Sequence, residues 1–171
     1  MTTVRLEVWL RGPVYGIPAL LMPVAHALAQ AAEDARDAVA GLTRDELLAR
    51  PGGAASVAFH LFHAAHALDR LMTYARGEAL SDSQRAALAV ERAAEFDADA
   101  AELLDQLDAA VERALRQLRC TPENSLLSDR SIGRQRFETT VLGLLFHAAE
   151  HTSRHVGQLI TTALIVSAAR G

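Results

Sequence analysis

Three histidines, His147, His151 and His155, recur at four-residue intervals in an otherwise apolar segment near the C-terminus. We expect this segment to be helical. Residues four apart on an α-helix differ by about 40° in azimuth and by one turn in height, so neighbouring imidazoles of this series can bind one metal ion. Two imidazoles on one helix do not complete a metal site, and a further ligand has to come from elsewhere in the chain.

A second histidine group can supply that ligand. His60, His63 and His66 recur at three-residue intervals in a segment that we also expect to be helical. Packing explains any single one of these histidines as well as metal binding does, because a neutral imidazole is tolerated at a partly buried position when one ring nitrogen has an acceptor. The clustering of histidines in two short segments suggests a helical bundle with a metal site, and both interpretations stay open at this point.

The histidines differ in their position relative to the apolar side of their helix. At about 100° per residue, His155 falls within the apolar sector of its helix and His151 beside it, whereas His147 lies further round. On the other helix, His63 lies roughly opposite the apolar stripe that contains Leu61. Amphipathicity therefore does not choose His63 as a ligand, unless both faces of this helix are covered or the metal lies near one end of the bundle.

The string His147-Ala148-Ala149-Glu150-His151 also matches the H-x-x-E-H motif of one class of zinc peptidases. In that class the glutamate activates a zinc-bound water. Here Glu150 points away from the apolar sector, and the chain is small for a protease with a substrate cleft. We interpret the match as chance.

Composition excludes several classes of partner. The net charge is −4, and the 17 basic residues are all arginines scattered without a block, so we expect no binding to nucleic acid or to an anionic membrane. The apolar run over residues 156–169 is shorter than the ~20 residues that span a bilayer. Cys120 is the only cysteine, which excludes a disulfide framework and predicts a cytoplasmic protein.

Glycines and prolines divide the chain into helical segments. Residues 1–16 contain Gly12, Pro13 and Gly16 and are expected to form an extended N-terminal arm. Thr43 and Ser81 begin capping boxes, which predict a short helix after each. No segment alternates with a period of two, so we expect an all-α fold, a four-helix bundle, as a single domain over residues 1–171. The long helices are expected over residues 17–39, 55–74, 97–118 and 138–169, with a polar connection over residues 125–136.

Three segments of the sequence resemble the DinB-like superfamily. The resemblance implies a four-helix bundle of up-down-down-up topology that binds a divalent metal ion through three histidines, which here are His63, His151 and His155. His60 and His147 are additional imidazoles, and either can replace one of these ligands. The segments that carry the resemblance are SVAFHLFH at 56–63, LDRLMTYARG at 68–77 and EHTSRHVGQ at 150–158.

The resemblance also implies a function. Three imidazoles leave positions open on zinc or nickel, or on manganese or iron, so that water or a substrate thiolate can bind. Superfamily members with assigned activities resemble thiol-dependent S-transferases and metal-dependent hydrolases, and we expect the same here, with a low-molecular-weight thiol as co-substrate. The small-molecule substrate and the catalytic residues are not identified by the sequence.

Further residues are candidates for supporting roles around the metal. Ligating imidazoles usually donate their other ring nitrogen to an oxygen acceptor, for which Glu150, Gln158 and Asp69 are candidates. Arg70 can receive an anionic group of a substrate. Trp9 and Arg11 of the arm are expected to cover the site.

An alternative of another class stays open. The long apolar first and last helices can bury themselves against a second copy of the chain, which predicts a homodimer. In this interpretation the protein is a non-catalytic dimerising bundle, and its histidines are packing residues.

Overall fold

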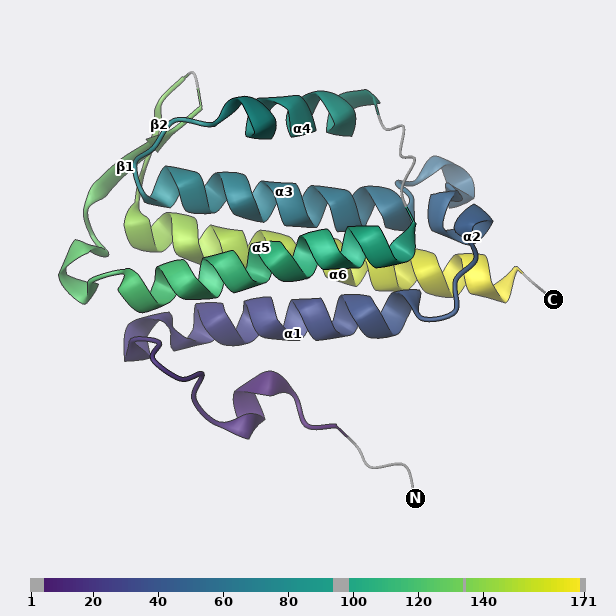
Figure 1. The fold of residues 1–171 in the computed structure, drawn as a ribbon, viewed down its shortest axis with the longest axis horizontal. Helices are drawn as coiled ribbons and strands as arrows, with labels where there is room; N and C mark the ends of the chain where they lie inside the picture. The colour runs from purple at the N-terminus through teal and green to yellow at the C-terminus, as the bar shows by residue number, and fades with distance from the viewer. Residues whose placement is uncertain (1–4, 94–98, 134, 170–171) are drawn as a thin grey trace.

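Four long α-helices lie side by side in the computed structural model of the chain, which describes residues 5–93, 99–133 and 135–169 (Figure 1). Helices α1 and α6 run in one direction, and α3 and α5 run in the other. The prediction of a mainly helical fold is confirmed, with a small sheet in addition. The helices are α1 (Met22–Val39), α2 (Arg44–Leu48), α3 (Val57–Ala75), α4 (Asp82–Ala93), α5 (Ala100–Cys120) and α6 (Val141–Ala168), and 3₁₀ turns occur at Val8–Arg11, Ala19–Leu21, Pro51–Gly53 and Glu123–Ser125.

Side-chain caps fix where these helices begin. The Ser56 hydroxyl accepts the Phe59 N–H at the start of α3, and the Thr140 hydroxyl accepts the Gly143 N–H at the start of α6. Each cap satisfies a backbone donor that has no partner within the helix. The predicted capping boxes at residues 43–46 and 81–84 are both present.

Helix α1 starts later than predicted. Residues 19–21 form a 3₁₀ turn, and the α-helix begins only at Met22, with Pro23 in its first turn. Proline favours this place because it has no N–H to leave unpaired there. Helix α5 begins at Ala100 behind the cap Asp99, and its predicted start at Asp97 lies outside the described residues.

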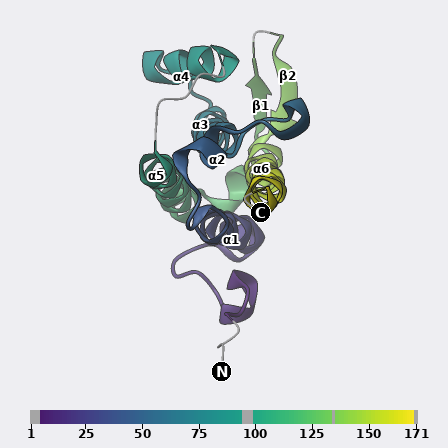
Figure 2. The same cartoon turned by 90° about the vertical axis from the view of Figure 1, so that its right-hand side faces the viewer.

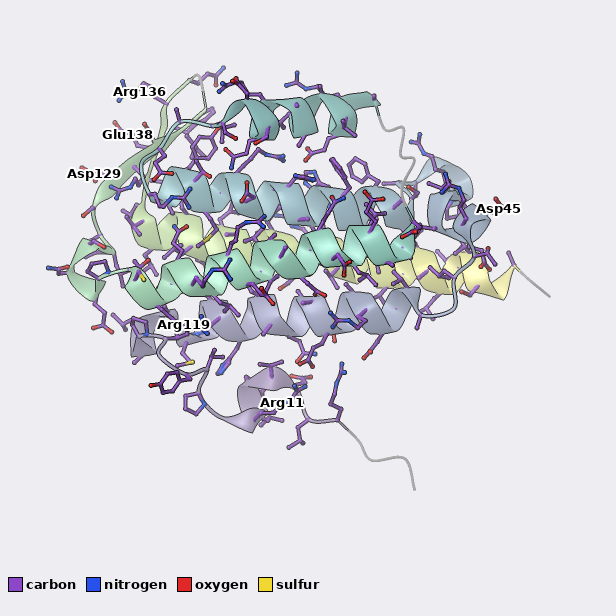
Figure 3. The ribbon with its side chains drawn as sticks, in the orientation of Figure 1. Arg11, Asp45, Arg119, Asp129, Arg136 and Glu138 are labelled. Atoms are coloured by element: carbon purple, nitrogen blue, oxygen red, sulfur yellow. The ribbon has the colours of Figure 1, made fainter. Side chains whose placement is uncertain are left out.

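A β-hairpin replaces the polar connection predicted before α6. Strands β1 (Asp129–Ile132) and β2 (Phe137–Thr140) pair antiparallel, with Ile132 opposite Phe137. The predicted helix start at residue 138 is therefore wrong, because the aromatic and β-branched residues of β2 favour a strand and α6 starts only after Thr140. Asp129, Arg136 and Glu138 project from this hairpin at one end of the molecule (Figure 3).

The core lies between α1, α3, α5 and α6, as the view along the helices shows (Figure 2). Fully buried leucines from all four helices meet there, among them Leu28, Leu61, Leu107 and Leu145. Helix α4 lies outside this group and covers the opposite face of α3, to which Gln84 and Glu91 bond. Both faces of α3 are therefore covered.

The N-terminal arm packs on the outer side of α1. The backbone N–H of Val8 donates to Gln30 Oε1 at 2.8 Å, and Arg11, which is labelled in Figure 3, forms two hydrogen bonds of 2.7 Å with Glu33. Within the described residues, no helix is long and apolar enough to cross a membrane.

Candidate metal centre

One ring nitrogen from each of His63, His151 and His155 can be chosen so that all three lie within 4.8 Å of one another. His63 Nε2 is 2.9 Å from His151 Nε2, and the centroid of the His155 ring lies 4.3 Å from that of His63 and 4.6 Å from that of His151. All three side chains are partly buried. Such a group of imidazoles, each open at one nitrogen, is a candidate binding site for a divalent metal ion.

The packing of α3 against α6 produces this cluster. His151 and His155 lie one turn apart on α6, on the side that faces α3. Thr152, between them, is fully buried, so this part of α6 lies against the core, and its hydroxyl donates to the Ala148 carbonyl 2.8 Å away in the same helix. His63 meets the pair from the N-terminal half of α3.

Helix α4 contributes an acidic residue that the sequence did not single out. Glu91 Oε2 is 3.2 Å from His63 Nδ1, and the same carboxylate accepts two hydrogen bonds from Arg70, of 2.7 and 3.1 Å. The side chains of Glu91 and Arg70 are only 9% and 10% exposed. When His63 donates Nδ1–H to Glu91, its Nε2 is left with a free lone pair that faces the other two histidines.

The two additional histidines lie at the edges of the cluster. His60 is buried, and its Nδ1 is 3.1 Å from His155 Nδ1, which leaves His155 Nε2 available for a metal ion. His147 is 47% exposed at its side chain, and its Nδ1 lies 3.3 Å from Glu150 rather than among the three nitrogens.

The remaining candidates lie further out. Asp69 accepts from Gln84 at 2.6 Å rather than from one of the three clustered histidines, and Gln158 lines a small surface hollow that also includes His60. Arg70, considered for an anionic substrate, is bound to Glu91 instead. The expectation that Trp9 covers the site is wrong, as is that for Arg11, because both pack with the arm against α1.

The comparison with protein families agrees with this geometry. The family model of the DinB superfamily matches residues 27–159, a range that includes all three clustered histidines and Glu91. The chain belongs to the DinB superfamily. This confirms the resemblance read from the sequence, and no curated protein matches the chain.

Two imidazoles of this DinB-superfamily site, those of His151 and His155, are held in the uncharged form. Burial, together with the nearby His63, lowers the pKa of His151 from 6.5 to about 4 and that of His155 to about 3. The pKa of His60 is lowered for the same two reasons. Neutral imidazole is the form that binds metal, so His151 and His155 are prepared for binding at neutral pH.

The low pKa values predict a loss of stability in acid for the metal-free DinB-superfamily chain. Below the unfolded pKa of about 6.5, the unfolded chain takes up protons at His151 and His155 that the folded chain does not, down to about pH 4 and 3 respectively. Above pH ~6.5 both histidines are uncharged in the folded and in the unfolded chain, so they no longer change the free energy of unfolding with pH. Between these pH values, each histidine adds at most about 1.4 kcal/mol per pH unit to the slope of the free energy of unfolding against pH. Solvent screening of these partly exposed rings reduces that slope.

Urea unfolding of the EDTA-treated protein across this pH range measures the slope. The double variant His151→Gln/His155→Gln lacks both titrating rings, so its free energy of unfolding should fall less steeply in acid. Equal slopes for the variant and the wild type would contradict the assignment of this acid sensitivity to the cluster.

Proposed function

We propose that His63, His151 and His155 bind one divalent metal ion and that the chain is a metal-dependent enzyme. The observation that carries the proposal is the convergence of three ring nitrogens within 4.8 Å. The donor set fits the ion in two further respects, because burial keeps two of the rings neutral and the Glu91 carboxylate orients the third. Zinc and nickel suit an all-imidazole set, with manganese and iron as further candidates.

Arg154 opposes metal binding at His151. Its Nη2 lies 3.3 Å from His151 Nδ1 and, since a guanidinium can only donate, it places Nδ1 in the acceptor role. A metal ion on Nε2 requires the proton on Nδ1, so this contact must be given up. We therefore expect Arg154→Ala to tighten zinc binding about fivefold, since removing a nearby like charge in a solvated setting is worth about 1 kcal/mol.

Competition with a chromophoric chelator measures this change. Arg116→Ala serves as the matched control, because Arg116 is also an exposed arginine paired to a glutamate four residues away in sequence. Weaker binding in Arg154→Ala would show that Arg154 supports the site rather than opposes it.

The reaction that we propose is thiol S-transfer, or hydrolysis, of a small molecule. Held by His63, His151 and His155, a divalent ion would supply Lewis acidity and would lower the pKa of a bound water or low-molecular-weight thiol. Glu91 holds the His63 ring, and Arg70 compensates the charge of that carboxylate. The ring of Phe59 stacks on that of His63, with the two ring centroids 5.5 Å apart.

Assays of the zinc- or nickel-loaded protein with 1-chloro-2,4-dinitrobenzene plus dithiothreitol, and with 4-nitrophenyl acetate, test the two reactions. Turnover that requires metal and disappears in His155→Ala supports the proposal, and the substrate that reacts separates transfer from hydrolysis. Equal rates with metal-free protein and with His155→Ala would contradict both.

The arrangement of the long helices belongs to the same proposal. We propose that α1, α3, α5 and α6 form the up-down-down-up bundle implied by the family resemblance, in agreement with their directions in Figure 1. The free and exposed Cys120 is consistent with a cytoplasmic protein, which we also propose.

A second candidate function is that of a non-catalytic dimerising bundle. Phe146, Leu164 and Ile165 of α6 are 65%, 67% and 51% exposed, which favours burial against a second copy of the chain. Light scattering after gel filtration should give twice the chain mass of 18.4 kDa, and Leu164→Arg should lower it to 18.4 kDa. A wild-type protein that is monomeric would contradict the dimer. If the protein both binds metal and dimerises, only the activity assays distinguish a metal-dependent enzyme from a non-catalytic bundle.

A further inference from the structure

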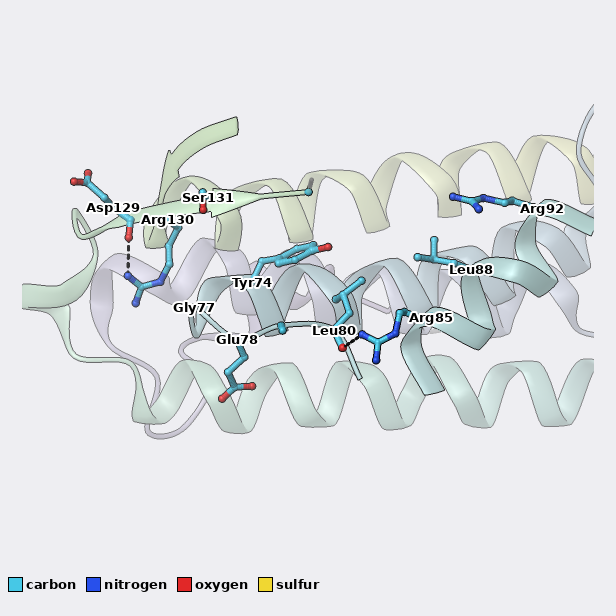
Figure 4. Close-up of a pocket in the computed structure, with 12 residues that line it drawn as sticks. Tyr74, Gly77, Glu78, Leu80, Arg85, Leu88, Arg92, Asp129, Arg130 and Ser131 are labelled. Atoms are coloured by element: carbon cyan, nitrogen blue, oxygen red, sulfur yellow. Dashed lines mark hydrogen bonds between the residues drawn. The ribbon is translucent and has the colours of Figure 1, made fainter. Parts of the chain in front are cut away.

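A groove of about 920 Å³ lies between the C-terminal end of α3, helix α4 and the β-hairpin (Figure 4). Its size is that of small-molecule sites, which span roughly 300–1,000 Å³. The Tyr74 ring lies in its middle, and Leu80 and Leu88 add apolar surface. Arg130 stands at one end of the groove and Arg92 at the other.

Two of the charged residues along the groove are already compensated. Glu78 forms an ion pair of 2.8 Å with Arg76, and Arg85 pairs with Asp82. Neither therefore contributes a free charge to a ligand. The charge that remains for a ligand comes from the two arginines at the ends.

Arg130 is a preorganised anion-binding group. Its Nε donates to the Ala75 carbonyl at 2.9 Å and its Nη1 to the Asp129 carbonyl at 2.8 Å, and its stem runs past Gly77, where a Cβ would lie 3.5 Å from Nε. These contacts use two of the five guanidinium N–H groups and leave three for a ligand. Both acceptors are backbone carbonyls, so the positive charge is positioned but not neutralised.

Arg92 provides a second positive charge at the other end. In the part of the chain that the structure describes, neither Arg92 nor Arg130 forms an ion pair with a carboxylate. Asp129 is the acidic residue that remains, and its carboxylate points away from Tyr74 (Figure 4). The groove therefore combines an aromatic and aliphatic middle with positive ends.

The end at Arg92 is connected to the candidate metal centre through α4. Arg92 directly follows Glu91, whose carboxylate is 3.2 Å from His63 Nδ1. Arg85, Leu88 and Arg92 form one stripe of α4 along the groove, and seven residues of helix correspond to about 10 Å. This stripe runs along α4 to the residue that directly follows Glu91.

We propose that this groove binds an elongated carboxylate with an apolar middle, held at its charged end by Arg130 and directed by Arg92 toward the three histidines. The role as a substrate site rests on the proposed function of the metal centre, whereas binding to the groove does not. Arginine pairs with carboxylate through two parallel hydrogen bonds, which the free N–H groups of Arg130 allow. Tyr74 and Leu88 select for an apolar or aromatic body.

Titration of ¹⁵N-labelled protein with 4-phenylbutyrate tests the proposal, with neutral 4-phenylbutanamide as the matched ligand. We expect saturable shifts of the amide signals of Gly77, Leu80 and Leu88 with the acid, and at least tenfold weaker binding of the amide. Arg130→Gln should weaken binding of the acid about tenfold and Arg92→Gln about threefold. Arg116→Gln, on the exposed side of α5, should change nothing.

The variant Arg92→Gln keeps the test decisive if Arg130→Gln disturbs the hairpin, because Arg92 is exposed and positions no other described side chain. The proposal would be overturned by any of four results. These are no saturable binding, equal binding of the acid and the amide, wild-type affinity in both groove variants, or chemical-shift changes centred on Trp9. The titration is made with EDTA-treated and with zinc-loaded protein. Binding in the groove without metal uptake would contradict only the proposed metal centre. Metal uptake without binding in the groove would contradict only the proposed carboxylate site.

Discussion

Replacing His63, His151 or His155 by alanine is expected to weaken zinc binding by more than 100-fold. Residues that only orient a ligand are worth about 10- to 100-fold in metal affinity, and removing a ligand itself exceeds that range. The three nitrogens lie within 4.8 Å, so each variant leaves two donors and an incomplete site. Chelator competition on the EDTA-treated variants measures the affinity, and circular dichroism confirms that each is folded.

His66→Ala is the matched control for this series. His66 lies on the same helix as His63, one turn further on, and its Nε2 bonds Gln106 at 3.2 Å on the side of α5. Its removal should leave zinc binding unchanged. Undiminished binding in all three cluster variants, or an equal loss in His66→Ala, would show that the metal is bound elsewhere.

Glu91→Ala should cost about 3–5 kcal/mol in the free energy of unfolding and weaken zinc binding about 10- to 100-fold. The stability effect is large because the pair with Arg70 is buried, with 9% and 10% of the side chains exposed, and removing one partner leaves an uncompensated charge. The pKa of Glu91 is raised by burial but lowered overall by the hydrogen bonds from His63 and Arg70, so the carboxylate is charged at neutral pH. The affinity effect follows because His63 loses its acceptor.

A double variant separates these two effects. In Glu91→Leu/Arg70→Leu both charges are replaced by apolar side chains, which often restores most of the stability of a buried pair. We expect the free energy of unfolding, measured in urea, to be near the wild-type value, while zinc binding is still 10- to 100-fold weaker. Wild-type zinc affinity in this folded variant would contradict a positioning role for Glu91.

Two of the clustered histidines could be predicted from the sequence, and the third only by resemblance. His151 and His155 are one turn apart near the apolar side of α6, so local periodicity places them together. His63 lies on the face of α3 opposite Leu61, which amphipathicity assigns to solvent. The structure shows why that assignment fails, because α4 covers this face and brings Glu91 and Arg70 to it.

Glu91 itself could not be predicted, although one signal was present. It lies on a short helix in which Ala87 is the only buried residue described, so its pattern is that of a solvated helix. The spacing of Gln84, Ala87 and Glu91 along one side of α4 shows which side packs, once the position of α4 is known. That position depends on contacts between segments far apart in sequence, which periodicity does not report.

The arm and the hairpin were predicted less well for a related reason. Arg11 is 22 residues from Glu33, its ion-pair partner, and nothing local connects the two. The strand Phe137–Thr140 is too short and too exposed to show a clear alternation, and Thr140 ends it by capping α6. Caps and helix periods are local signals, whereas tertiary pairing of short segments is not.

Elemental analysis of the protein purified without a histidine tag tests the central claim most directly. The three-histidine centre predicts close to one equivalent of zinc or nickel per chain, retained through gel filtration with a weak chelator. Absence of metal, together with no thermal stabilisation on addition of zinc, nickel or manganese, would contradict the metal centre and leave the histidines as packing residues.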